Sequence, residues 1–245
     1  MERWVGRVAV VTGASAGIGA AVLKALASHG MSVVGLARRK HRVKELAEEL
    51  QSQGCTGKVF AVRADISREE DILLAFSWIE KSLGGVDVFV NCASITSNVT
   101  LIEGRTEEWR RVLEVNLLGP CICAREAVKL MRARPADDAH IININSNTMN
   151  DGAGKGMTRA TRQAAMILGQ GLRSELADAR SRIRVTNVTA GGVSGPGAQQ
   201  FAQLEERQAA ELVTFILAAP PAFQVTEVML RSFTEKAALA QRANK

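Results

Sequence analysis

The sequence predicts an α/β protein with one doubly wound parallel sheet, formed as a single domain over residues 1–245. Short apolar runs rich in β-branched residues alternate along the chain with longer segments of helical spacing. Runs that are almost continuously apolar indicate strands covered by helices on both faces. A repeated strand, helix, strand order implies parallel strands joined by right-handed crossovers. The 245 residues also suffice for a core without disulfides or metals.

Seven segments are expected to be strands, the last of them short. In chain order they are 7–12, 32–37, 58–63, 86–91, 140–145, 182–188 and 227–230. Helical spacing and good helix formers lie between them. The expected helices are 20–29, 43–53, 69–83, 158–177 and 206–217. In the long helix 158–177, Leu168 and Leu176 are expected to face the core and Arg173 to face solvent.

Composition and charge indicate an ordinary globular protein that binds a small anion. Apolar residues make up 47% of the chain and charged residues 23%, which excludes the disordered and disulfide-stapled classes. The formal net charge is +6, and one basic cluster accounts for most of the excess: Arg38, Arg39, Lys40, Arg42 and Lys44. A local cluster on a near-neutral background favours one bound anion, so we expect no nucleic-acid partner.

Neither a metal site nor a membrane location is expected. The four cysteines and three histidines lack the spacing of a zinc site, so we expect reduced thiols and no metal ligands. The chain runs from its start into a strand pattern without a signal-peptide stretch. No apolar run approaches the roughly twenty residues that a membrane span needs. We therefore expect a cytoplasmic protein.

A glycine-rich turn follows the first expected strand and leads into the first expected helix. Its glycines are Gly13, Gly17 and Gly19, with Ser15 and Ile18 between them. Such glycines allow a tight turn and let backbone N–H groups approach a pyrophosphate, which the positive end of the helix stabilises. Its place between strand and helix favours a dinucleotide-binding Rossmann fold over a merely tight turn.

The second expected strand ends at Arg38 and Arg39, where dinucleotide-binding folds select their cofactor. A carboxylate there holds the ribose hydroxyls of NAD, whereas a basic residue suits the 2′-phosphate of NADP. No Asp or Glu occurs between Glu2 and Glu45. The sequence therefore predicts NADP(H), with Arg38 as the main phosphate contact and Arg39 or Arg42 in support. The alternative is a solvated basic start of a helix.

Further motifs extend a resemblance over nearly the whole chain. They are the opening MERWVGRVAVVTGASAGIG, LARR after the second strand, EEWRRVLEVNLLG at 107–119, HIININS at 140–146 and EVMLR at 227–231. With these segments the chain resembles the short-chain dehydrogenase/reductases, most of all the NADP-dependent farnesol-dehydrogenase-like members from insects. The resemblance implies that Asp65 and Ile66 border the adenine and that Asn91 and Ala93 line the cofactor. It also implies that Asn116 holds a bent helix and an ordered water.

In this family a Ser, a Tyr and a Lys carry the chemistry, with an Asn in support. By the resemblance, the Tyr is the general acid or base, and the Lys lowers its pKa and holds the nicotinamide ribose. Ser146 matches the Ser and Asn116 the Asn, but Thr158 stands at the Tyr position and Arg162 at the Lys position. The chain has no Tyr at all, so this conclusion does not depend on the local alignment.

Loss of the Tyr removes the proton donor that hydride transfer to a carbonyl requires. A phenol near pKa 10 can be tuned toward neutrality, whereas a threonine hydroxyl is a far weaker acid. Loss of one general acid costs on the order of a hundredfold to ten-thousandfold in rate. Arg162 keeps a donor for the ribose. Lys155 is a candidate substitute acid, although a solvated loop lysine is the favoured interpretation.

Two functions remain open. The first is an NADP(H)-linked oxidoreductase of small-molecule alcohols or carbonyls, with isoprenoid-like apolar substrates and impaired catalysis. The second is a catalytically inactive NADP(H)-binding protein that acts as a partner or regulator. Segment 190–224 is expected to cap the substrate and 234–245 to form a C-terminal tail. The resemblance implies a homodimer or homotetramer.

Overall fold

The computed structural model describes residues 1–134, 138–146, 156–191 and 204–231. Within these ranges seven parallel strands form one sheet in the order β3-β2-β1-β4-β5-β6-β7. They are β1 (Val8–Thr12), β2 (Ser32–Ala37), β3 (Lys58–Arg63), β4 (Val88–Asn91), β5 (His140–Ser146), β6 (Arg184–Ala190) and β7 (Glu227–Leu230). The strand order reverses at β1, which pairs with both β2 and β4. Each strand overlaps an expected segment, and the predicted doubly wound sheet is confirmed.

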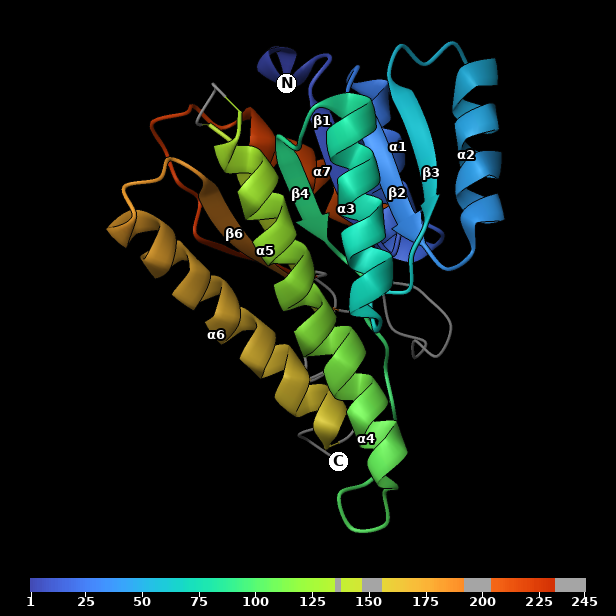
Figure 1. Ribbon diagram of the computed structural model, residues 1–245, viewed down its shortest axis with the longest axis vertical. Helices are drawn as coiled ribbons and strands as arrows, with labels where there is room; N and C mark the ends of the chain where they lie inside the picture. Colours follow the sequence, from blue (N-terminus) through green and yellow to red (C-terminus); the bar gives the residue numbers. More distant parts are fainter. Residues whose placement is uncertain (135–137, 147–155, 192–203, 232–245) are drawn as a thin grey trace, which may run out of the picture.

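Helices cover both faces of the sheet, as Figure 1 shows. The helices are α1 (Gly17–Ser28), α2 (Lys40–Ser52), α3 (Glu69–Leu83), α4 (Thr106–Leu113), α5 (Gly119–Arg132), α6 (Met157–Asp178) and α7 (Glu206–Ala218). Side chains of α1, α2 and α7 share one apolar core with one face, and those of α3, α5 and α6 share a second core with the other. This double cover explains the continuously apolar strands. Among the described residues, no helix has the length and apolar character of a membrane span.

The helix between β4 and β5 is absent from the predicted set. It consists of α4, a π-helical turn η2 (Glu114–Leu118) and α5, which follow one another without a break. The wider turn shifts later side chains around the helix axis, so the apolar positions do not keep a single 3.6-residue period. Asn116, where the resemblance implies a bent helix, lies in this π-helical turn.

The buried face of α6 differs from the prediction in two places. Leu176 is buried as expected, but Leu168 is 45% exposed. Arg173 does not face solvent, because its guanidinium donates to two backbone carbonyls, each at 3.1 Å. The helix meets the sheet at Gly169, where a Cβ would lie 2.1 Å from Asn187 Oδ1. Close backbone contact therefore replaces leucine packing at the middle of α6.

His140, the first residue of β5, is buried and neutral. Its Nε2 lies 2.8 Å from the hydroxyl of Thr186, which donates its own proton to the carbonyl of Val225. Nε2 must therefore be the donor, which leaves Nδ1 of the neutral ring without a proton. Burial, together with the charges of Arg184 and Arg3, lowers the pKa of His140 to about 3.

Candidate nucleotide-binding site

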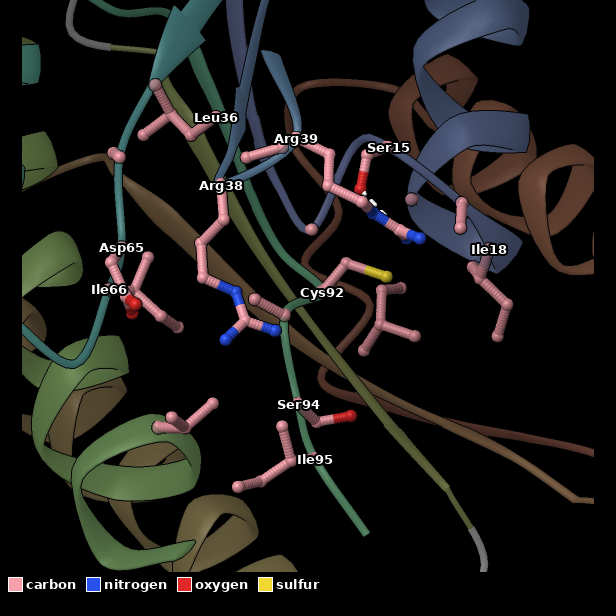
Figure 2. Close-up of a pocket in the computed structure, with 18 of the residues that line it drawn as sticks. Ser15, Ile18, Leu36, Arg38, Arg39, Asp65, Ile66, Cys92, Ser94 and Ile95 are labelled. Atoms are coloured by element: carbon pink, nitrogen blue, oxygen red, sulfur yellow. Dashed lines mark hydrogen bonds between the residues drawn. The ribbon is translucent and has the colours of Figure 1, made fainter. Parts of the chain in front are cut away.

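A cavity of about 350 Å³ opens where β1, β2, β3 and β4 end (Figure 2). Its lining includes most of the predicted cofactor residues: Gly13, Ser15, Ile18, Gly19, Arg38, Arg39, Asp65, Ile66 and Ala93. It also includes residues that sequence reasoning did not assign: Ala16, Leu36, Ala37, Ala64, Cys92, Ser94, Ile95, Val115, Ile144 and Asn145. Gly17 belongs to the same turn as the first residue of α1, without lining the cavity. Asn91 and Arg162 border a second cavity instead.

The glycine-rich turn has a shape that side chains would fill. Gly13 has a φ of +69°, and a Cβ there would lie 2.9 Å from the Cα of Ala93. At Gly19 a Cβ would lie 2.5 Å from the carbonyl oxygen of Gly13. Only glycine permits both close approaches, and α1 begins directly within this turn. The cradle at a helix start fits the pyrophosphate of a dinucleotide.

Two exposed guanidinium groups stand at the end of β2. Figure 2 shows Arg38 reaching into the cavity and Arg39 turning toward Ser15, whose Oγ accepts a hydrogen bond from Nη2 at 3.3 Å. Within the described ranges neither arginine forms an ion pair with a carboxylate. Arg42, the other predicted support, pairs with Glu45 at 3.3 Å and does not line the cavity. Arg38 and Arg39 therefore leave two positive charges for an anionic ligand.

Asp65 stands with Ile66 across the cavity from the glycine-rich turn (Figure 2). Burial acts to raise the pKa of its carboxyl group. Hydrogen bonds from the hydroxyl and amide of Ser67, at 2.8 and 3.1 Å, and the charges of Arg38 and Arg111 outweigh burial and lower the pKa. Asp65 is therefore ionised at neutral pH and can accept a hydrogen bond from a purine amino group.

Thr12 fastens the end of β1 to the segment after β4, and sequence reasoning missed this role. Its buried Oγ1 accepts hydrogen bonds from the amides of Cys92 and Ala93 at 2.9 and 3.1 Å and donates to Asn91 Oδ1 at 3.3 Å. Thr12 thus joins Asn91 and the two residues after it to the end of β1. A single threonine at the end of a strand forms no sequence pattern. Its position directly before the glycine-rich turn is the one feature from which this role could have been predicted.

The predicted catalytic positions hold the chain that follows β4. Asn116 binds both backbone groups of Ile95: Oδ1 accepts from the amide at 2.9 Å, and Nδ2 donates to the carbonyl at 3.0 Å. Thr158, which is fully buried, binds Ser97 in the same way. Its Oγ1 accepts from the amide of Ser97 at 2.9 Å and donates to the carbonyl at 3.0 Å.

Arg162 holds the residue between these two. Its Nη2 donates to the hydroxyl of Thr96 at 3.1 Å, and the side chain is almost buried. Thr161 connects the network, because its Oγ1 accepts from Asn116 Nδ2 at 3.1 Å. Residues 95–97 are called the strap below, and Asn116, Thr158 and Arg162 are called the clamp. Each clamp residue holds one strap residue.

The clamp changes what position 158 can do chemically. The hydroxyl of Thr158 has one proton, and a backbone carbonyl of the strap accepts it. Thr158 is absent from the lining of both cavities. Ser146 is the last residue of β5, in register with Ala190 of β6. Lys155, the tail 234–245 and residues 192–203 of the expected capping segment lie outside the described residues. The described part of that segment includes α7, whose buried side chains pack in one core with those of α1.

A groove of about 680 Å³ lies between α5 and α6. Asn143 and Asn187 form its floor and are joined by a hydrogen bond of 3.1 Å from Nδ2 to Oδ1. Apolar wall residues are Ala124, Val128, Ala165, Leu168 and Leu172. The groove adjoins the first cavity through shared lining residues, which are Ala93, Ser94, Ile144 and Asn145.

The chain is similar to known proteins over nearly its whole length. The family model described as short chain dehydrogenase matches residues 7–206 of this chain. "Dehydrogenase/reductase SDR family member 11" of Gallus gallus is 40% identical over 249 residues, covering 94% of this chain and 98% of that protein. "Farnesol dehydrogenase" of Aedes aegypti is 39% identical over 246 residues, covering 96% of this chain and 100% of that protein.

Solved structures show the same likeness. The alcohol dehydrogenase of the archaeon Thermococcus sibiricus, complexed with 5-hydroxy-NADP, superposes with a TM-score of 0.81 at 29% identity, covering 93% of this chain and 97% of that one. A metagenomic short-chain oxidoreductase in complex with NADP gives a TM-score of 0.80 at 28% identity, with the same coverage of 93% and 97%.

Proposed function

The chain belongs to the short-chain dehydrogenase family of oxidoreductases, and from this membership we propose an NADP(H)-linked function with impaired turnover of apolar alcohols or carbonyls. The NADP-type ligands of two solved relatives support the choice of cofactor. The 39% sequence identity to a farnesol dehydrogenase, over nearly the whole chain, supports an isoprenoid-like substrate class.

The residues around the first cavity fit NADP(H). The cradle at Gly13 and Gly19 suits the pyrophosphate, and Arg38 and Arg39 suit the 2′-phosphate. Asp65 meets the adenine. When bound, the cofactor supplies the hydride for carbonyl reduction or accepts it from an alcohol. The chain's own task would then be to orient the substrate and to deliver a proton to its oxygen.

The observation that carries the impairment is the state of the Thr158 hydroxyl. It is a weak acid, fully buried, and its proton is bound by the carbonyl of Ser97. A general acid must reach the reacting oxygen directly or through one water. Ser146 and a water held by Asn116 are candidates to polarise a carbonyl, and Lys155 is a candidate proton donor. We infer turnover that is lower by on the order of a hundredfold to ten-thousandfold than with a tuned phenol.

A second candidate function is NADP(H) binding without turnover, with the protein acting as a binding partner or a regulator. The clamp favours it, because two catalytic positions are engaged with the strap. Pairing as a homodimer or homotetramer is part of both proposals. The exposed apolar side chains along α6, Ile167 at 62% and Leu168 at 45%, support an intermolecular contact there.

Oxidation of NADPH in the presence of apolar and isoprenoid aldehydes and ketones tests the proposal. The wild-type chain is compared with the double variant Thr158→Tyr with Arg162→Lys, and with Thr214→Tyr, which adds the same phenol on α7. We expect turnover in the double variant well above that of the wild type and of the control. Wild-type rates in the ordinary range of about 1 to 1,000 per second would disprove impairment. An absence of NADPH binding would disprove the proposed cofactor.

A further inference from the structure

Glu206, the first residue of α7, places a carboxylate beside the first residue of α1. A Cβ built at Gly17 would lie 3.9 Å from Glu206 Oε1. Gly17 belongs to the glycine-rich turn, between Ala16 and Ile18, which both line the first cavity. The packing of the two helices holds this arrangement, because buried side chains of α1 and α7 lie in one core. The carboxylate therefore lies at the edge of the proposed pyrophosphate cradle.

The charge of Glu206 is not neutralised by a cation of the described residues. The neighbouring Arg207 pairs with Glu211 at 2.9 Å and with Glu205 at 3.9 Å. Within the described ranges Glu206 itself forms no ion pair and no side-chain hydrogen bond. The positive amino ends of α1 and α7 compensate its charge instead, because their first N–H groups have no partner within the helix. Glu206 is therefore an anion of the chain itself at the start of α1.

The start of α1 is also where the proposed cofactor brings its own negative charge. Free N–H groups and the helix dipole favour a phosphate there for the same physical reason that they favour a carboxylate. Two anions that share one helix end repel each other. Between unit charges a few ångströms apart at a protein surface, this repulsion corresponds to about threefold to thirtyfold in a dissociation constant. A pyrophosphate therefore binds against the charge of Glu206.

We propose that Glu206 sets the nucleotide affinity of this chain by weakening every ligand that places a pyrophosphate at the start of α1. The inference rests on the proposed NADP(H) site, and it adds a residue that opposes the cofactor to those that hold it. Because Glu206 acts on the pyrophosphate, it weakens NADPH and NADH by the same factor. It does not select between them, which is the role proposed for Arg38.

Isothermal titration calorimetry of the full chain tests the inference with Glu206→Gln, which keeps the size of the side chain and removes its charge. We expect the variant to bind NADPH and NADH more tightly than the wild type by one common factor, about threefold to thirtyfold. Adenosine 2′-monophosphate lacks the pyrophosphate, so its dissociation constant should change by less than about twofold.

Glu211→Gln is the matched control. Glu211 lies further along the same helix and pairs with Arg207, so its charge is neutralised away from the cradle. This variant loses the same charge from the same helix, and all three dissociation constants should stay within about twofold of the wild type. An equal gain in NADPH affinity in both variants would overturn the inference, because the total charge of the chain would then explain it.

Thermal melting supplies a second readout. Without nucleotide, Glu206→Gln should melt about 1–4 °C below the wild type, because two helix amino ends lose a favourable charge. Saturating NADPH should raise the melting temperature of the variant more than that of the wild type. A lower melting temperature with unchanged nucleotide affinity would mean that Glu206 serves only the folded helices, and this would overturn the inference.

The remaining outcomes separate the inference from the function on which it rests. If NADPH binds the wild type and Glu206→Gln equally well, the inference fails and the cofactor assignment stands. If adenosine 2′-monophosphate gains as much affinity as NADPH, the assignment of Glu206 to the pyrophosphate is wrong. If neither protein binds NADPH, the inference and the proposed cofactor both fail. An NADPH complex that forms only with the variant would support both.

Discussion

The hydroxyl of Thr158 and the backbone of Ser97 satisfy each other, with the hydroxyl accepting from the amide at 2.9 Å and donating to the carbonyl at 3.0 Å. The two residues are 61 positions apart, and the pair joins the first turn of α6 to the chain after β4. The resemblance predicts that position 158 corresponds to the family's proton-transferring phenol. Here the same position has a structural contact.

Replacing Thr158 with Val tests that contact. The shape of the side chain is nearly kept, but the amide and carbonyl of Ser97 lose their partner, so we expect the free energy of unfolding to fall by about 2–3 kcal/mol. Urea unfolding followed by circular dichroism measures this. Thr214→Val is the control, because the Thr214 hydroxyl donates to the carbonyl of Glu211 in its own helix. A change within about 0.5 kcal/mol is expected. Equal effects of the two variants would contradict the clamp.

Arg38→Ala tests the choice of cofactor. Loss of a charge-assisted contact to the 2′-phosphate should weaken NADPH binding by roughly tenfold to hundredfold and leave NADH binding nearly unchanged. Titration of nucleotide fluorescence measures both constants. Arg42→Ala is the matched control, because Arg42 pairs with Glu45 outside the cavity. A similar loss of NADPH affinity in both variants would mean that general positive charge, rather than Arg38, selects the cofactor.

Gly13→Ala and Gly54→Ala separate backbone strain from crowding. Both glycines have positive φ, +69° and +75°, but a Cβ at Gly13 would lie 2.9 Å from Ala93 Cα, whereas nothing lies within 4 Å of a Cβ at Gly54. Strain alone should cost about 1 kcal/mol at Gly54. Gly13→Ala should cost about 3 kcal/mol or more and abolish nucleotide binding. Chemical denaturation measures the free energy of unfolding of each variant, and calorimetry measures nucleotide binding. Equal losses of stability in Gly13→Ala and Gly54→Ala would contradict the close approach of Gly13 to Ala93.

The buried His140 makes folding stability depend on pH. Its pKa is lowered to about 3 in the folded chain, against about 6.5 when unfolded, so the unfolded state binds the extra proton between these values. Stability is therefore full above pH 6.5 and falls as the pH is lowered. Between pH 7.5 and 5 this group should cost about 2 kcal/mol. His140→Gln should reduce the measured difference between the two pH values by that amount, and an unchanged difference would exclude His140 as its source.

The strands could be predicted because each contains a short apolar run, and the runs of β1 and β2 are buried along almost their whole length. Helix starts were less accessible: α1 begins at Gly17 and α2 at Lys40, three residues before the predicted starts, because glycines and a basic run conceal the helical period. The π-helical turn concealed the helix from 106 to 132 in a similar way.

The nucleotide side of the site was more predictable than the catalytic side. A glycine-rich turn and an arginine at a strand end have a fixed chemical purpose, and the structure gathers both around one cavity. The resemblance assigns catalytic positions to 158 and 162, and this assignment stays a prediction; it gave no sign of the contacts that these residues make. Those contacts join residues 61 and 66 positions apart, and the partner of Thr158 is a backbone group that every residue type possesses.

Gly169 brings α6 so near β6 that a Cβ there would lie 2.1 Å from Asn187 Oδ1, and Asn145 and Asn187 donate to carbonyls of the same helix at 2.7 and 3.0 Å. Arg162 lies seven residues, about 10 Å, from Gly169 along α6. A bulkier residue at position 169 would push α6 away from β6 and would displace Arg162 with it. Thr96 of the strap, which Arg162 holds, would then move as well.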